Sequence, residues 1–129
     1  MTQNNTKIYV TANGTRMSLA AAIKIAPSVT HLTIENQPTL RETPRFPAAT
    51  VVWVYNCPRL SVLPELPAVT DVWVYNCPGL SALPELPAAT SVAVYNSPRL
   101  SALPELPAAT DIWVYNCPGL TAHKQESAQ

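Results

Sequence analysis

The feature that most constrains the fold of this chain is a repeat with a period of 20 residues. Four nearly identical copies begin at Val51, Asp71, Ser91 and Asp111, and a more divergent copy begins at His31. A unit this short cannot bury its own apolar face, so neighbouring copies must stack, and five copies exceed the roughly three that a continuous core requires. The sequence therefore predicts a solenoid.

The first half of each unit has the pattern of a β-strand. In one copy, Val72 and Val74 alternate with the aromatic residues Trp73 and Tyr75. Alternation of β-branched and aromatic residues with a period of two is typical of a strand with one buried face. We expect the valines to point into the core and the aromatic rings to point outward.

The second half of each unit predicts an extended return segment. Leu80, Leu83 and Leu86 lie three residues apart, and Pro84 and Pro87 interrupt them. These prolines exclude a helix but suit a polyproline-like conformation, which has three residues per turn. Because crossovers between parallel strands are nearly always right-handed, the fold class that we predict is a leucine-rich-repeat-like, right-handed solenoid of the α/β class, mostly β. Its parallel sheet forms one face, the extended returns form the other, and a short helix caps the N-terminus.

The repeat also predicts three parts of the chain. Residues 1–28 lack it and are expected to form an N-terminal strand–helix cap that shields the first coil. Residues 29–122 hold five 20-residue units, of which the last is truncated. Residues 123–129 form a polar C-terminal tail.

Within the cap, residues 8–10 predict a first strand and residues 13–14, Asn-Gly, predict a turn. An amphipathic helix is expected to begin near Ser18. Either Ser18 or Thr15 would serve as its N-cap, and Pro27 would stop it.

A family resemblance rests on the motif Leu-Pro-Glu-Leu-Pro, a following Val-x-Val strand, and Asn or Cys before Pro-x-Leu. Over residues 29–122 this pattern resembles the short leucine-rich repeats of bacterial type III effector proteins, whose units have about twenty residues. The resemblance implies target recognition by the repeats, because some members carry a separate C-terminal ubiquitin-ligase domain. The sequence predicts no such domain here. It departs from the family by Asn-Cys-Pro-x-Leu in place of Asn-x-Leu, and by Val or Ala in place of strand-flanking leucines (Ala49, Val69, Ala89, Ala109).

The outward strand positions are the candidate binding residues. Stacked coils would align them into two aromatic columns with an aspartate at the start of alternate strands, about 4.8 Å from rung to rung. Aromatic residues dominate binding hot spots, although the same rings could serve only to stabilise the sheet by cross-strand contacts. The candidate partner-binding residues are Trp53, Tyr55, Asp71, Trp73, Tyr75, Tyr95, Asp111, Trp113 and Tyr115.

Three further columns have structural interpretations. An asparagine follows every strand (Asn36, Asn56, Asn76, Asn96, Asn116) and predicts a buried amide column that satisfies backbone groups at the turn. The cysteines (Cys57, Cys77, Cys117) predict small buried core residues rather than metal ligands or a disulfide. A column of glutamates on the back wall (Glu65, Glu85, Glu105) predicts a solvated stripe that a basic partner could also contact.

The remaining features argue against several function classes. Lys plus Arg and Asp plus Glu number eight each, so no basic excess predicts a nucleic acid partner. Only His31 and His123 could act as general bases, and neither has a repeated nucleophile nearby, so we predict no enzyme, no cofactor and no metal. The sequence shows no signal peptide and no membrane segment. With three cysteines it favours a reducing compartment, either the cytoplasm or a destination reached by a signal-peptide-independent route.

The function predicted from these features is a non-enzymatic repeat module that binds a protein partner through an exposed Trp/Tyr strand face. The alternative is a self-associating structural scaffold, natural or consensus-designed, because zero net charge and an aromatic face favour homo-oligomers. Carbohydrate binding is a third hypothesis, since flat aromatic arrays suit sugar rings. The sequence identifies neither the partner nor the oligomeric state.

Overall fold

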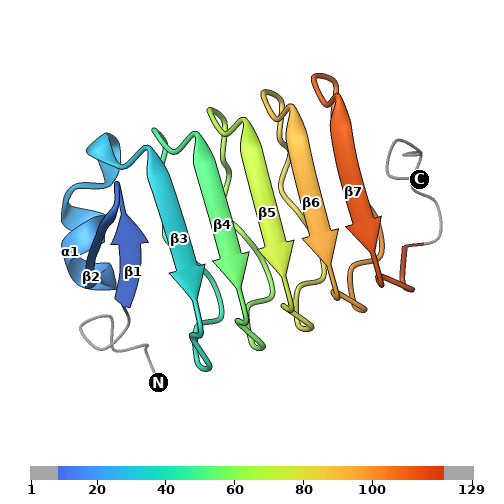
Figure 1. Cartoon of the computed structure of the whole chain (residues 1–129), viewed down its shortest axis with the longest axis horizontal. Helices are drawn as coiled ribbons and strands as arrows, with labels where there is room; N and C mark the ends of the chain where they lie inside the picture. Colours follow the sequence, from blue (N-terminus) through green and yellow to red (C-terminus); the bar gives the residue numbers. More distant parts are fainter. Residues whose placement is uncertain (1–8, 121–129) are drawn as a thin grey trace.

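The structure, a computed structural model, describes residues 9–120 and is a parallel β-solenoid (Figure 1). Residue 8 of the expected first strand, and the expected tail at residues 123–129, lie outside the described residues. The elements in chain order are β1 (Tyr9–Ala12), β2 (Thr15–Ser18), α1 (Leu19–Lys24), a 3₁₀ turn (Ala26–Ser28), β3 (His31–Glu35), β4 (Val51–Tyr55), β5 (Asp71–Tyr75), β6 (Ser91–Tyr95) and β7 (Asp111–Tyr115).

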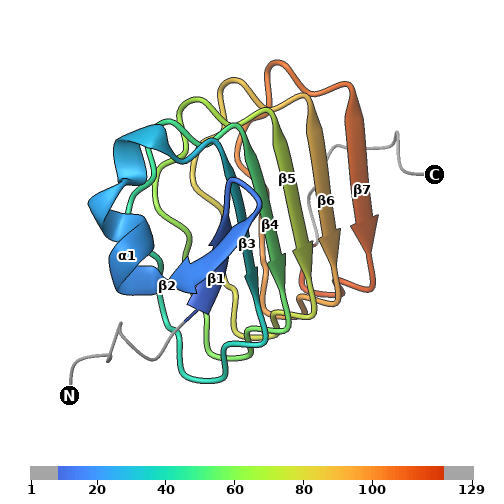
Figure 2. The same cartoon turned by 60° about the vertical axis from the view of Figure 1, so that its left-hand side comes forward.

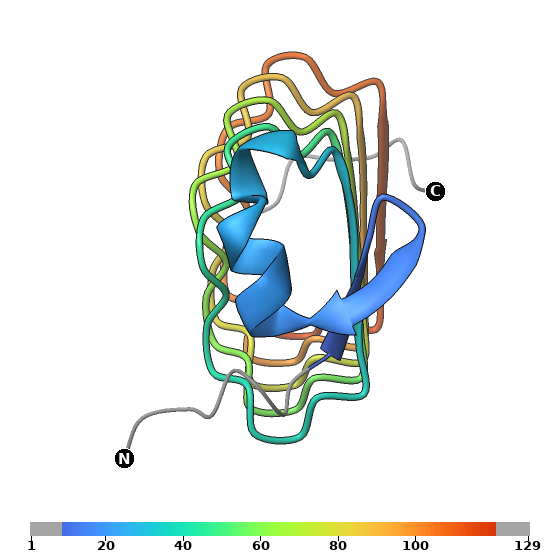
Figure 3. The same ribbon diagram turned by 90° about the vertical axis from the view of Figure 1, so that its left-hand side faces the viewer.

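All the strands belong to one sheet in the order β2-β1-β3-β4-β5-β6-β7. Strands β3 to β7 are parallel, and each residue pairs with the residue 20 positions later, for example Trp53 with Trp73. Viewed from the N-terminal end, the chain runs clockwise as it recedes (Figure 3), so the solenoid is right-handed as predicted.

The core is built as the sequence pattern predicts. Val72 and Val74 are fully buried between the sheet and the return segments, and Leu80, Leu83 and Leu86 are at most 8% exposed. An extended return segment with three residues per helical turn therefore directs every third side chain, here a leucine, into the core.

Each coil leaves the sheet through a β-turn that begins at the cysteine position. In the coil of β4, the backbone N–H of Leu60 donates to the carbonyl of Cys57 at 3.1 Å, with Pro58 and Arg59 at the two central positions. Proline suits the first central position because its φ is fixed near the value that the turn needs. The cysteines are free and buried, as predicted, and the inward position of the turn is theirs.

Threonines organise the edge at which the strands begin. The Oγ1 of Thr70 donates to the carbonyl of Thr50 at 3.2 Å, and Thr50, Thr90 and Thr110 make the same contact with the preceding coil. These contacts join neighbouring coils at the residue just before each strand begins. They therefore help to fix the register between one strand and the next.

The N-terminal cap closes the first coil in two ways. The antiparallel pair β1–β2 extends the sheet, and α1 lies across the open end of the coil (Figures 2 and 3). Asn13 fastens the two parts, because its Oδ1 accepts from the backbone N–H groups of Thr30 and His31 at 2.9 and 3.1 Å, and its Nδ2 donates to the carbonyl of Ser28 at 2.9 Å.

The expected helix and its N-cap are confirmed, with Ser18 accepting from the N–H of Ala21, but the cap also contains a strand that the sequence did not predict. Strand β2 has the sequence Thr-Arg-Met-Ser, which shows no apolar alternation, and it forms because the tight turn at Asn13 and Gly14 (φ 52° and 84°) folds it back onto β1. The helix is short and gives way to the 3₁₀ turn that contains Pro27.

Candidate interaction surface

On strands β4 to β7 the outer face of the sheet carries seven aromatic side chains, which we call the aromatic surface. They come from β4 to β7, whose central and last residues face away from the core, and register pairing aligns them in a tryptophan column and a tyrosine column. The aromatic surface consists of Trp53, Trp73 and Trp113 with Tyr55, Tyr75, Tyr95 and Tyr115.

Ring stacking fixes much of this surface. The ring centroids of Trp53 and Trp73 lie 5.3 Å apart with planes 17° from parallel, and those of Tyr75 and Tyr95 lie 4.5 Å apart with planes at 6°. Tyr55 meets Tyr75 edge to face at 5.2 Å. Such pairs contribute about 0.5 to 1.5 kcal/mol beyond their buried area, so the array is held in place before any partner arrives.

Exposure is greatest at the two ends of the aromatic surface. Trp53 is 36% exposed, Trp113 45% and Tyr115 68%, whereas the remaining tyrosines and Trp73 are half-buried. The indole Nε1 of Trp73 is buried and has no hydrogen-bond partner. Trp73 therefore belongs to the supporting stack as well as to the surface, and the rings most available to a partner are those at the ends.

Ala93 does not leave an open gap in the tryptophan column. Although it lies on the outer side of β6, it is only 3% exposed. Its register partners are Trp73 and Trp113, the larger side chains on either side. The alanine is therefore covered by surrounding atoms and is not open to solvent.

The two aspartates lie at the first positions of β5 and β7. Asp71 is half-buried and Asp111 is exposed, and Ser91 separates them in the sheet register. Within residues 9–120 the only ion pair joins Arg45 to Glu65 on the back wall at 3.9 Å, so neither aspartate has a cationic partner there. They border the tryptophan column with unpaired negative charge.

Two hydroxyl groups of the tyrosine column, those of Tyr55 and Tyr75, have raised pKa values. Burial, and secondarily the charge of Glu35, raises the pKa of Tyr55 above its ordinary value. Burial is the main cause that raises the pKa of Tyr75, and the neighbouring Tyr95 and Tyr55 raise it further. The hydroxyl groups of Tyr55 and Tyr75 are therefore protonated at neutral pH and can donate or accept hydrogen bonds.

The asparagines border the tyrosine column and form an asparagine ladder (Asn36, Asn56, Asn76, Asn96, Asn116). In each step Nδ2 donates to Oδ1 of the preceding coil, at 3.0, 3.1, 2.5 and 2.6 Å in chain order. All five residues have φ between 56° and 61°, a left-handed conformation that asparagine tolerates better than most residues.

The expectation of a buried amide column is wrong. Asn96 is half-buried and the other four asparagines are exposed. The positive φ turns the side chain out of the core, and the following cysteine takes the inward place, with Cys57 and Cys77 fully buried. A hydrogen bond with Cys57, together with burial, raises the pKa of the Cys77 thiol, so it stays protonated and unreactive.

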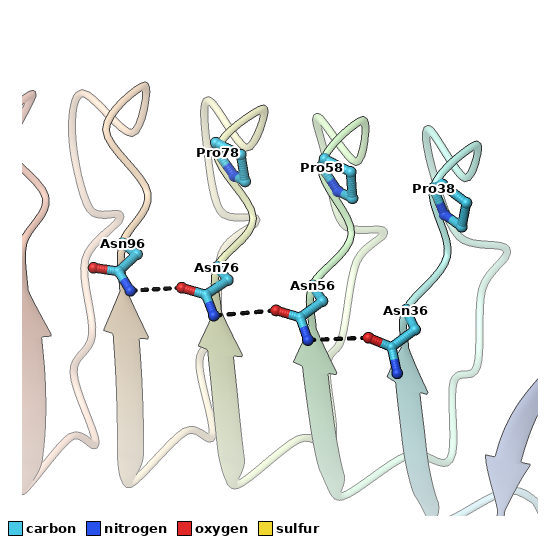
Figure 4. A pocket seen from close by; sticks show the side chains of 7 residues that line it. All are labelled: Asn36, Pro38, Asn56, Pro58, Asn76, Pro78 and Asn96. Carbon is cyan, nitrogen blue, oxygen red and sulfur yellow. Dashed lines mark hydrogen bonds between the residues drawn. The ribbon is translucent and has the colours of Figure 1, made fainter.

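A groove that the sequence interpretation missed runs along this edge of the sheet. It measures about 640 Å³, and Figure 4 shows the linked amides at the strand ends with proline rings beyond them. We call it the amide groove; it is lined by Asn36, Pro38, Asn56, Pro58, Asn76, Pro78 and Asn96. Each asparagine amide nitrogen carries two N–H groups, and the ladder uses at most one of them. The remaining N–H groups lie beside the apolar proline rings and can donate hydrogen bonds to a ligand. The signal in the sequence was the invariant Asn-x-Pro spacing, which we assigned to structure alone.

The histidines do not assemble a reactive centre in the part of the chain that is described. His31 is exposed at the start of β3, where its Nδ1 lies 3.1 Å from Oγ1 of Thr30, and His123 lies outside that part. Among residues 9–120 no three His, Cys, Asp or Glu side chains lie close enough to hold a metal ion.

Comparisons with protein-family models, with curated proteins and with solved structures give no match to this chain. Across the described residues, no helix has the length and apolar character needed to cross a membrane.

Proposed function

We propose that this chain is a non-enzymatic recognition module that binds a protein partner through its aromatic surface. The observation that carries the proposal is the array of seven aromatic side chains on one face of the sheet, six of them in ring contact with one another, with Trp53 and Trp113 at least one-third exposed. Contiguous apolar patches of this kind mark interaction sites on soluble proteins, and tryptophan and tyrosine are enriched in binding hot spots.

The surface has the mixed character of a protein interface. Its centre is apolar and preordered by stacking, which lowers the entropy that a partner must overcome on binding. Its borders are polar: Asp71 and Asp111 flank the tryptophan column, and the amide groove flanks the tyrosine column. A hydrophobic centre with a polar rim is the usual anatomy of such interfaces. The resemblance to effector repeats, which recognise targets, supports the same proposal.

The proposal is tested by comparing variants in affinity capture from cell extract. Wild type is compared with the double variant Trp53→Ala/Trp113→Ala and with the matched back-wall control Glu85→Ala/Glu105→Ala, both of whose glutamates are exposed. Loss of a hot-spot tryptophan costs about 2 kcal/mol or more, so affinity should fall by roughly thirtyfold or more in the aromatic variant. Equal capture by all three proteins would reject the proposal.

Light scattering over a hundredfold concentration range separates a foreign partner from self-association. The proposed function predicts a monomer for wild type and for both variants. An oligomer that grows with concentration and is lost in Trp53→Ala/Trp113→Ala would instead make the aromatic surface a contact between copies of the chain.

A further inference from the structure

The Arg–Gly alternation that accompanies the repeat creates a second groove, on the far side of the proline rings from the amide groove. It measures about 460 Å³. We call it the arginine groove; it is lined by Arg41, Pro58, Arg59, Ser61, Pro78, Gly79 and Arg99. Pro58 and Pro78 line both grooves and so separate them.

Gly79 explains why this groove is hollow. Its φ is not in the left-handed region, so the turn does not need glycine for its backbone angles. A Cβ at this position would lie 2.7 Å from the carbonyl oxygen of Pro58 and 3.2 Å from that of Leu60. The Gly79 turn therefore packs directly on the preceding turn, and no side chain fills the space between Arg59 and Arg99.

The two arginines lie on alternate coils. Two rungs separate them, which corresponds to about 9.6 Å along the solenoid at 4.8 Å per rung. Arg41 comes from the coil before and lines the same space, and Ser61 adds a hydroxyl group. Three arginines thus line one hollow, and Gly79 belongs to the same lining.

These cations have no acidic partner within the described range, residues 9–120. The one ion pair there uses Arg45, on the back wall, and Arg41, Arg59 and Arg99 are all exposed. Like charges this close repel one another, and the repulsion is relieved when a multiply charged anion lies between them. The planar fork of a guanidinium group matches the oxygens of a phosphate-type anion better than a point charge does.

We propose that the arginine groove binds a phosphate-type oxyanion carrying two or more negative charges, with Arg59 and Arg99 as its principal ligands and Arg41 and Ser61 as supporting ones. The site is distinct from the aromatic surface and lies at the same edge of the sheet as the amide groove. Gly79 is the structural requirement for it, because a Cβ there would meet the carbonyl oxygens of Pro58 and Leu60 and would force the two turns apart.

The test is a titration of the whole chain with inorganic pyrophosphate at constant ionic strength, followed by NMR. The backbone amide of Gly79 and the guanidinium Nε signals of Arg59 and Arg99 should shift and saturate, whereas Arg45 should not. Arg59→Gln and Arg99→Gln should each weaken pyrophosphate binding by about tenfold to a hundredfold, the range for a lost charge-assisted hydrogen bond. Arg45→Gln is the matched control and should bind like wild type.

Three outcomes would overturn the proposal. The first is a shift that does not saturate, or that sodium chloride of equal ionic strength reproduces, because this would show general screening. The second is unchanged pyrophosphate affinity in Arg59→Gln and Arg99→Gln, with thermal melting confirming that both are folded. Saturable binding of an acidic peptide in the absence of any pyrophosphate binding would also reject the oxyanion site.

Discussion

Substitution of Asn76 separates two contributions to stability that the asparagine ladder combines. The first is conformational: Asn76 has φ 58°, a region that costs an ordinary L-residue roughly 1 to 2 kcal/mol but costs glycine almost nothing. The second is the ladder itself. Asn76 donates to Asn56 at 3.1 Å and accepts from Asn96 at 2.5 Å, and each bond contributes about 0.5 to 1.5 kcal/mol.

Asn76→Ala loses both contributions and should lower the free energy of unfolding by about 2 to 4 kcal/mol, with the exposure of the ladder placing the bonds near the low end of their range. Asn76→Gly also loses the bonds but tolerates the backbone angle. After allowance for the greater entropy of glycine in the unfolded chain, it should be more stable than Asn76→Ala by about 0.5 to 1 kcal/mol.

The assay is equilibrium unfolding in urea, followed by far-ultraviolet circular dichroism and tryptophan fluorescence. Coincident transitions with an unchanged slope would show that the variants differ in stability and not in cooperativity. Two results would refute the reasoning. An alanine variant as stable as the glycine variant would mean that the backbone is not left-handed, and a glycine variant equal to wild type would mean that the ladder contributes nothing.

Three further predictions follow from packing and from the pKa shifts. Gly79→Ala should lower the free energy of unfolding by about 1 to 3 kcal/mol through overpacking, because its Cβ would lie 2.7 Å from the Pro58 carbonyl oxygen. Arg59→Ala, at an exposed position, should lower it by less than about 0.5 kcal/mol. Equal losses of stability in urea unfolding would contradict the close approach of Gly79 to the preceding turn. The raised pKa of Tyr75 stabilises the folded chain fully at pH values below the ordinary tyrosine pKa, and this stabilisation is lost as the pH rises through the pKa of the folded state. The free energy of unfolding should therefore fall above about pH 10, and it should fall less steeply in Tyr75→Phe. An identical alkaline profile in both proteins would reject this. Leu83→Ala should lower the free energy of unfolding by about 2 to 5 kcal/mol, and Trp113→Ala should lower it less, because Trp113 is 45% exposed. The reverse order in chemical denaturation would contradict the assignment of Leu83 to the core and Trp113 to the outer face.

The inside–outside pattern of the coil could be predicted because it depends on local periodicity. Alternation placed Val72 and Val74 inside and Trp73 outside, and three-residue spacing placed Leu80 and Leu86 in the core. Both patterns follow from the geometry of extended chains alone. The turn geometry did not follow in this way, because the left-handed φ of the asparagines leaves no mark on the two-residue and three-residue periodicities.

The candidate site was predictable in part for the same reason. The sequence placed the aromatic residues on the outer face, but not the half-burial of Trp73 or the covering of Ala93, which depend on the neighbouring coils. The two grooves depend on the relation between coils as well. Gly79 has no unusual φ that a turn rule could predict, and its role is visible only from the carbonyl oxygens of Pro58 and Leu60 beside it.

Site-specific photo-crosslinking in cell extract tests whether the aromatic surface is the binding face. A photoreactive phenylalanine analogue replaces Trp113 on the outer face in one protein and Glu105 on the back wall in the other, both of which are exposed. If the aromatic surface binds the partner, position 113 gives a discrete protein adduct that excess unlabelled wild type suppresses, and position 105 gives none. Adducts from the back wall alone, or no suppressible adduct from position 113, would contradict binding through this surface.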